Sequence, residues 1–93
     1  MPVIEPHAIP FRTDQVVWQE SDKDIIIRST RNGTEYSVQN VGADIWLVCD
    51  GENSVADIVE LLLAAYEVDR DTLQRDLTIF LNDLQTKGLI NFK

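Results

Sequence analysis

Cysteine and histidine are almost missing from this 93-residue sequence, which contains only Cys49 and His7. One thiol cannot form an internal disulfide bond, and one thiol with one imidazole cannot complete a structural zinc site. We therefore expect no cysteine framework and no bound metal. A single thiol fits a reducing compartment, so we expect the protein to be cytoplasmic.

Basic residues, glycines and long apolar runs are also scarce. Eight Lys and Arg stand against sixteen Asp and Glu, and the net charge of -8 repels phosphate backbones and anionic lipids. We therefore expect neither nucleic acid nor a membrane as a partner. The four glycines are isolated, so no phosphate-binding loop of the nucleotide-binding type is present. No segment approaches the roughly 18 apolar residues that span a bilayer, and residues 1–11 lack the pattern of a signal peptide.

What remains is the composition of one small soluble domain spanning residues 1–93. Hydrophobic residues make up 44% and charged residues 26%, which is enough for a compact core. Pro2, Pro6 and Pro10 disfavour helix at the start of the chain. We therefore expect residues 1–14 to form an extended, mobile arm.

Two segments after this arm have the residue types of β-strands. Val16–Trp18 and Ile25–Ile27 are rich in β-branched side chains, and the polar residues 19–24 are expected to connect them. Further along, Asn32-Gly33 predicts a type I′ hairpin turn, because both residues accept the positive φ angles of that turn.

A third strand is predicted over Glu35–Gln39, where polar and apolar residues alternate and Tyr36 and Val38 face inward. Three strands leave two open edges, whose outward N–H and C=O groups can accept an extended peptide as an additional strand. The sequence leaves open which strand is central, and we take Glu35–Gln39 as the candidate edge.

Helical spacing replaces the strand pattern after Asn40. Val41–Cys49 is expected to form a short amphipathic helix that ends at Asp50-Gly51. A second helix is expected to begin at Ser54, whose side chain can form a capping box with Asp57.

The third helix is the longest of the three, with Asp69 or Asp71 as its expected cap and Gly88 just beyond its end. An apolar stripe follows one side of it, made of Leu73, Leu77, Phe80, Leu81 and Leu84. Residues 89–92 are expected to return onto the core as an extended tail. Three strands followed by three helices predict an α+β fold in which a small antiparallel sheet packs beside the helices.

No residue stands out as catalytic. His7 lies in the proline-rich arm without a partner, and Cys49 lies on the apolar side of its helix, as a buried, unreactive thiol does. Four large aromatics could make a ligand surface, but in so small a domain they are expected in the core, and they are Trp18, Trp46, Phe80 and Phe92. The acidic side chains around the third helix suit caps and solvated faces, and they are Asp69, Asp71, Asp76 and Asp83. We therefore expect a protein that is not an enzyme and needs no cofactor.

The run from Gly33 to Gly51, with Ile45-Trp46 before Asp50-Gly51, resembles the PqqD family. The similarity continues in order through Val55–Val59, then Asp76-Leu77, Phe80-Leu81 and Leu84, and finally Gly88-Leu89-Ile90. It covers residues 16–92. Members of this family are the peptide-binding modules called RiPP recognition elements. They bind the leader segment of ribosomally made precursor peptides that are later modified.

The resemblance implies a winged-helix-like domain that binds a leader as an added strand, in a groove shared with the third helix. On this chain the strand positions are Glu35, Tyr36, Ser37, Val38 and Gln39, and the helix positions are Leu73, Leu77 and Phe80. Asp69, Arg75 and Asp76 are implied contacts for charged leader side chains. The implied partner enzyme is a leader peptidase, a cyclase or a radical SAM enzyme. Pathways to coenzyme PQQ and to lasso peptides both remain open.

Two other functions compete with peptide binding. A winged-helix DNA-binding regulator would use the third helix for recognition, although its three basic and three acidic residues from Arg70 to Lys87 cancel. A small enzyme is the third alternative, and it lacks a visible nucleophile and base. Residues 1–40 carry a net charge of -2 and residues 41–93 carry -6, so the acidity lies mainly on the helical half and favours a peptide with basic residues.

Overall fold

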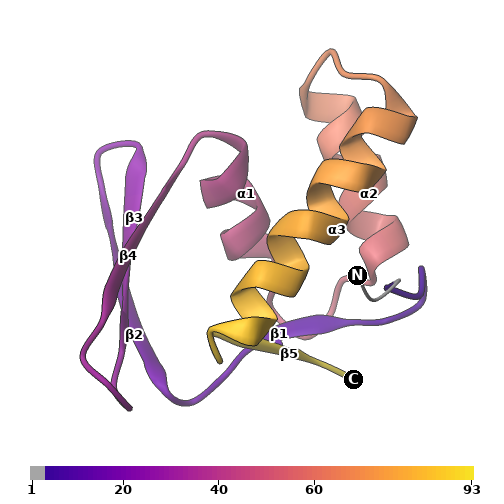
Figure 1. The fold of residues 1–93 in the computed structure, drawn as a ribbon. Helices are drawn as coiled ribbons and strands as arrows, with labels where there is room; N and C mark the ends of the chain where they lie inside the picture. Colours follow the sequence, from indigo (N-terminus) through magenta and orange to yellow (C-terminus); the bar gives the residue numbers. More distant parts are fainter. Residues whose placement is uncertain (1–3) are drawn as a thin grey trace.

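The computed structural model describes residues 4–93, so Pro2 of the predicted arm lies outside the described residues. A three-stranded antiparallel sheet is followed by three helices, as expected (Figure 1). The strands are β2 (Val16–Ser21), β3 (Asp24–Ser29) and β4 (Glu35–Gln39), and the helices are α1 (Val41–Val48), α2 (Val55–Ala65) and α3 (Arg70–Thr86). Two short strands, β1 (Pro10–Arg12) and β5 (Ile90–Phe92), form a second sheet below the helices in Figure 1.

The strand order is β2-β3-β4, so β3 is central and β4 is an edge. In the β3–β4 register Ile25 lies opposite Val38 and Ile27 lies opposite Tyr36. The two isoleucines are buried and their β4 partners are half-buried against the same core. The predicted inward direction of Tyr36 and Val38 is therefore confirmed, because the period of two puts these four side chains on one face.

The two hairpin connections differ from the sequence prediction. The strands β2 and β3 extend to Ser21 and Asp24, so only Asp22 and Lys23 connect them. Asp22 has a φ of 57°, and a positive φ at the first central position is the requirement of a type II′ turn. Aspartate tolerates this conformation, which is why the polar segment forms a tighter turn than expected.

The predicted type I′ turn at Asn32-Gly33 is wrong, because β3 and β4 are joined by the five residues 30–34. Only Gly33 of the pair has a positive φ, at 72°. The side chain of Asn32 instead accepts a hydrogen bond from the N–H of Thr34 at 3.0 Å. This local bond stabilises a wider loop in place of the two-residue turn.

The helix ends follow the predicted capping residues. Ser54 and Asp57 form a reciprocal capping box, with bonds of 3.1 Å and 3.0 Å between side chain and backbone. Asp69 caps α3 and accepts from the N–H of Thr72 at 3.0 Å. Within residues 4–93, no helix is both long enough and apolar enough to cross a membrane.

Backbone contacts tie the described part of the predicted arm, residues 4–14, to the rest of the domain. Strand β1 pairs with β5, so that Pro10 lies opposite Phe92, and the N–H of Ile9 donates to the carbonyl of Lys93 at 3.0 Å. The first turn of α2 also donates to the arm, because the N–H groups of Val55 and Ala56 bond to the carbonyls of Ala8 and Pro6. These bonds satisfy helix amides that would otherwise lack partners. The arm and the C-terminal tail therefore close the base of the domain together.

The core lies between the inner face of the sheet and the three helices. Trp46 is fully buried, as predicted, whereas Trp18 on edge strand β2 is 37% exposed and packs against Trp46 edge to face, with ring centroids 6.1 Å apart. The prediction that both tryptophans lie in the core is therefore wrong for Trp18. An edge strand has a neighbouring strand on one side only, so its side chains stay open to solvent on the other side. The buried core consists of Ile25, Ile27, Ala43, Ile45, Trp46, Cys49, Ile58, Val59, Leu62, Leu73, Leu77, Leu81, Leu84, Leu89 and Ile90.

Candidate peptide-binding site

Strand β4 presents one row of backbone groups to the open edge of the sheet. The N–H of Ser29 donates to the carbonyl of Thr34 at 2.9 Å, and this pair continues the β3–β4 register. Hydrogen-bonded and non-bonded pairs alternate along an antiparallel ladder, so Tyr36 and Val38 bond to β3. The N–H and C=O groups of Glu35, Ser37 and Gln39 therefore face outward, which is what an additional strand requires.

The same alternation assigns the outward groups of β2. The N–H of Thr30 donates to the carbonyl of Gln15 at 2.8 Å, in line with the β2–β3 register. The groups that face away from β3 therefore belong to Val16, Trp18 and Glu20. The sheet has two open edges, and they differ in what lies beside them.

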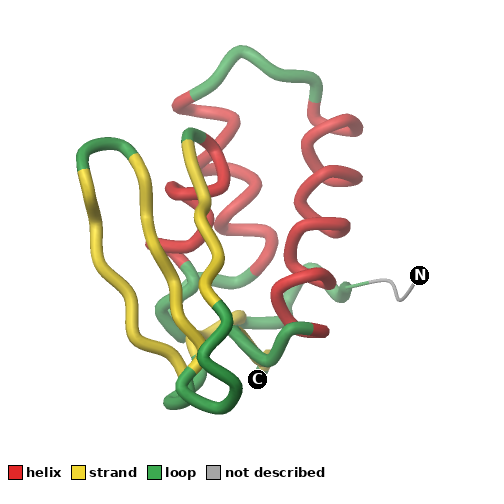
Figure 2. The backbone as a smooth tube through the Cα atoms, turned by 60° about the vertical axis from the view of Figure 1, so that its left-hand side comes forward, coloured by secondary structure: helices red, strands yellow, loops and turns green. Residues whose placement is uncertain are grey.

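Helix α3 lies beside the β4 edge and not beside the β2 edge (Figure 2). Gly42 in the first turn of α1 lies between the two elements, because a methyl group there would lie 3.4 Å from Cζ of Phe80 and 3.6 Å from Cβ of Val38. Phe80 and Val38 are both half-buried against the core. We call the strip of surface between β4 and α3, with Val38 on one side and Phe80 on the other, the β4–α3 groove.

The other end of the β4–α3 groove carries a charged pair. The ammonium of Lys87 lies 5.2 Å from the ring centroid of Tyr36 and 2.5 Å from a carboxylate oxygen of Asp83. A cation over an aromatic face is attracted by the ring, and the aliphatic stem of lysine covers apolar surface. Lys87 thus holds Tyr36 in place while its charge remains partly exposed at the groove.

The three apolar positions predicted on the third helix do not share one environment. Phe80 is half-buried and faces the groove, whereas Leu73 and Leu77 are 7% and 1% exposed and belong to the core. A stripe that packs a helix onto a core buries its central residues, and only its margin can face a groove. Phe80 is the margin residue on the β4 side.

The three charged residues predicted to contact the leader also lie in different places. Asp69 is engaged in capping α3. Asp76 is exposed and lies one turn before Phe80, on the same side of α3. Arg75 lies five residues before Phe80, which is about 140° around a helix of 3.6 residues per turn, so it points away from the groove.

Sequence reasoning missed Gly42, Asp83 and Lys87 as parts of this region. Lys87 follows Phe80 by seven residues and Asp83 precedes Lys87 by four, so helical spacing places all three side chains on adjacent rows. That signal was available in the sequence. Gly42 carries no comparable signal, because its contact with Phe80 joins elements that are distant in the chain.

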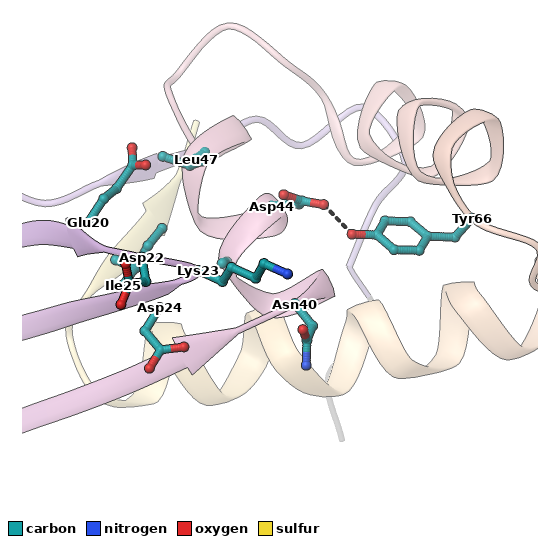
Figure 3. A pocket seen from close by; sticks show the side chains of 10 residues that line it. Glu20, Asp22, Lys23, Asp24, Ile25, Asn40, Asp44, Leu47 and Tyr66 are labelled. Carbon is teal, nitrogen blue, oxygen red and sulfur yellow. Dashed lines mark hydrogen bonds between the residues drawn. The ribbon is translucent and has the colours of Figure 1, made fainter.

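A second hollow lies at the end of the sheet beyond Asn40 (Figure 3). In this view the side chain of Lys23 extends into it, between Asp44 and Asn40. The hydroxyl of Tyr66 donates a hydrogen bond to Asp44, and this bond is the main reason why the pKa of Tyr66 is raised. The remaining lining includes the acidic side chains of Glu20, Asp22 and Asp24.

Other chemistry in the described chain is limited. Burial raises the pKa of the Cys49 thiol to about 12, so it stays protonated and unreactive, as the sequence predicted. Among residues 4–93, no three His, Cys, Asp or Glu side chains converge as metal ligands would. On α3, Arg70 pairs with Glu60 at 2.7 Å and Lys87 pairs with Asp83, which neutralises two of its three basic residues and disfavours DNA recognition.

The fold and the groove define a class of protein, a small α+β domain whose open strand edge faces a helix. The family follows from comparison of sequences. Residues 24–90 match the model of the family described as coenzyme PQQ synthesis protein D, PqqD. The chain belongs to the PqqD family, and the resemblance noted in its sequence is confirmed.

Relatives with the name PqqA binding protein come from Bradyrhizobium diazoefficiens and Rhodopseudomonas palustris. One from Bradyrhizobium diazoefficiens is 32% identical over 90 residues, which cover 96% of this chain and 79% of the relative. One from Rhodopseudomonas palustris is 38% identical over 50 residues, which cover 54% of this chain and 49% of the relative. The chain thus spans about half the length of the Rhodopseudomonas palustris relatives that it matches.

Two solved structures share the fold. TbiB1 in complex with the TbiA(beta) leader peptide has a TM-score of 0.82 and 32% identity, over 87% of this chain and 94% of that chain. Lasso peptide synthetase B1 complexed with the leader peptide has a TM-score of 0.81 and 20% identity, over 89% of this chain and 98% of that chain. The second match shows the fold alone.

Proposed function

We propose that this protein binds the leader segment of a ribosomal precursor peptide and performs no chemistry itself. The leader adds as a strand to the open edge of β4 and lies in the β4–α3 groove. Backbone groups of Glu35, Ser37 and Gln39 supply hydrogen bonds, and Phe80 with Tyr36 and Val38 supplies apolar contact.

The observation that carries this proposal is the difference between the two sheet edges. Both edges offer outward N–H and C=O groups, but only the β4 edge has a helix beside it with a half-buried aromatic ring at the contact. Main-chain bonds give affinity with little dependence on sequence, and alternate side chains that meet the groove give discrimination. The names of the relatives and the titles of the solved structures support a leader peptide as the ligand.

A tether is sufficient for the biological role. Holding the leader places the rest of the precursor near a partner enzyme at a raised effective concentration. The partner is a maturation enzyme, either a leader peptidase, a cyclase or a radical SAM enzyme. We place the protein in the cytoplasm, where ribosomal precursor peptides are made.

A fluorescence anisotropy titration tests the proposal. The labelled peptides are the leader of the precursor encoded beside this gene, which we call the cognate leader, the TbiA(beta) leader, and a scrambled cognate leader. We expect saturable binding of the cognate leader, weaker binding of the TbiA(beta) leader and none of the scrambled peptide. Equal binding of the cognate and scrambled leaders, or turnover of a precursor by the isolated protein, would contradict the proposal.

A further inference from the structure

The two ends of the β4–α3 groove differ in their charged side chains. Lys87 lies over Tyr36 at the end where β4 begins, and Arg31 belongs to the loop that leads into that end. Lys87 follows Phe80 on the helical path and Asp76 precedes Phe80 by one turn, so Asp76 lies toward the end where β4 finishes. The basic side chains therefore lie at the Glu35 end, with Asp83 beside Lys87, whereas the α3 side chain toward the other end is acidic.

Lys87 has the capacity to bind a further anion. Its ammonium has three donors, and the contacts described here are one carboxylate oxygen of Asp83 and the face of Tyr36. Its side chain is 35% exposed, so part of the charge reaches the groove. A carboxylate of a bound peptide near Tyr36 would meet this cation, whereas the same carboxylate near Asp76 would meet a like charge.

The acidic end has support beyond a single carboxylate. The hollow beyond Asn40 is lined by Glu20, Asp22, Asp24 and Asp44, with Lys23 as its one basic lining residue (Figure 3). A basic side chain of a peptide that extends past Gln39 enters the negative field of these carboxylates. Because the hollow is partly buried, water and salt screen this field less than they do at an open surface.

We propose that the β4–α3 groove selects leaders by the order of their charges. An acidic leader side chain binds Lys87 at the Glu35 end, and a basic leader side chain binds Asp76 at the Gln39 end. This inference rests on the proposed function and adds to it a chemical class of ligand, an extended peptide with one charge of each sign in a fixed order.

The distance between the two charged groups fixes the spacing in the leader. Asp76 and Lys87 are eleven residues apart, which is about 16 Å along a helix at about 1.5 Å per residue. An extended strand needs about five residues at about 3.3 Å each to cover that distance. Because only every second side chain of an added strand faces α3, we expect the acidic and basic leader residues to be four positions apart.

Double-mutant cycles test the charge order with the cognate leader as the probe. The protein variants are Lys87→Met, which keeps the aliphatic stem over Tyr36, and Asp76→Asn, which keeps the shape of the side chain. Arg75→Gln is the matched control, because it removes a charge from α3 on the side away from the groove. Each acidic leader residue is replaced by Gln and each basic one by Gln in turn, and thermal melting verifies that every variant is folded.

We expect Lys87→Met and Asp76→Asn each to weaken binding about two- to fivefold, the usual range for partly exposed ion pairs, and Arg75→Gln to leave it unchanged. Each effect should disappear when one leader residue is neutralised, and the two residues should be four positions apart. Exchanging these two leader residues keeps the net charge of the peptide and should weaken binding about tenfold, because two attractions become two repulsions.

Three results separate failure of this inference from failure of the proposed function. If the wild-type protein binds the cognate leader but both variants and the exchanged leader bind equally well, the charge order is wrong and leader binding stands. If the exchanged leader binds more tightly, the polarity is reversed and the inference is overturned. Absence of leader binding by the wild-type protein overturns the function and this inference together.

Discussion

Replacing Ser37 by proline removes one outward N–H of β4 and leaves the β3–β4 ladder intact. Ser37 faces Ile26 in a non-bonded pair, so its N–H has no role in holding β4 to β3. Proline is tolerated on edge strands when its missing N–H points outward, and it favours extended backbone for the residue before it. The variant therefore tests the edge and not the fold.

The size of the effect follows from the groups that an added strand loses. One backbone hydrogen bond contributes about 0.5–1.5 kcal/mol net. The proline ring also holds the peptide away from the neighbouring outward groups of Glu35 and Gln39, so more than one bond is weakened. We expect Ser37→Pro to cost about 1.5–3 kcal/mol of leader binding, which is about a 10- to 100-fold increase in Kd.

Glu20→Pro is the matched control for this variant. Glu20 is exposed and lies on β2, and its N–H faces the other open edge of the same sheet. The assay is the anisotropy titration with the cognate leader, with the melting temperature of each variant measured in parallel. Strand addition to β4 predicts a large loss for Ser37→Pro and at most a small one for Glu20→Pro, whose carboxylate lies in the hollow beyond Asn40. Equal affinities of the two variants, with both folded, would refute the reasoning.

Three further predictions concern the groove and the core. Phe80→Ala should weaken leader binding and lower the free energy of unfolding by about 1–3 kcal/mol. The control Ile79→Ala, on the exposed side of α3, should change neither quantity much. Equal leader affinities of these two variants would remove Phe80 from the site. Gly42→Ala should raise the free energy of unfolding by about 0.5–1 kcal/mol in urea denaturation, because the new methyl group fits at contact distance and glycine weakens a helix. A decrease in that free energy would mean that Phe80 cannot accommodate the methyl group. The Cys49 thiol should react with a disulfide reagent at pH 8 only after unfolding. Because its pKa is 9.0 unfolded and about 12 folded, the free energy of unfolding should fall as pH rises from about 9 toward about 12, and this part of the fall should be missing in Cys49→Ala.

Local patterns in the sequence were sufficient for the elements that form the groove. The period of two in Glu35–Gln39 gave the correct inward residues, because a strand with one buried face must alternate. The spacing of apolar residues from Leu73 to Leu84 gave the correct core face of α3. The caps Ser54 and Asp69 were correct because a side-chain acceptor at a helix start satisfies a backbone donor whatever lies around it.

Contacts between segments that are distant in the chain could not be predicted from the sequence alone. Pairing of β1 with β5 joins the two ends of the chain, whereas the prolines indicated only that the arm is extended and not what it pairs with. Pro10 is compatible with β1 because it is the first residue of a short strand. The approach of Phe80 to Gly42 depends on how α1 and α3 pack, which no local period encodes.

Amide hydrogen exchange, resolved by residue with NMR, tests strand addition to β4 most directly. The free protein is compared with the protein saturated with the cognate leader. We predict that the amides of Glu35, Ser37 and Gln39 become protected when the leader binds, while those of Val16, Trp18 and Glu20 exchange as before. Protection along β2, or unchanged exchange along β4 with the leader bound, would contradict the account.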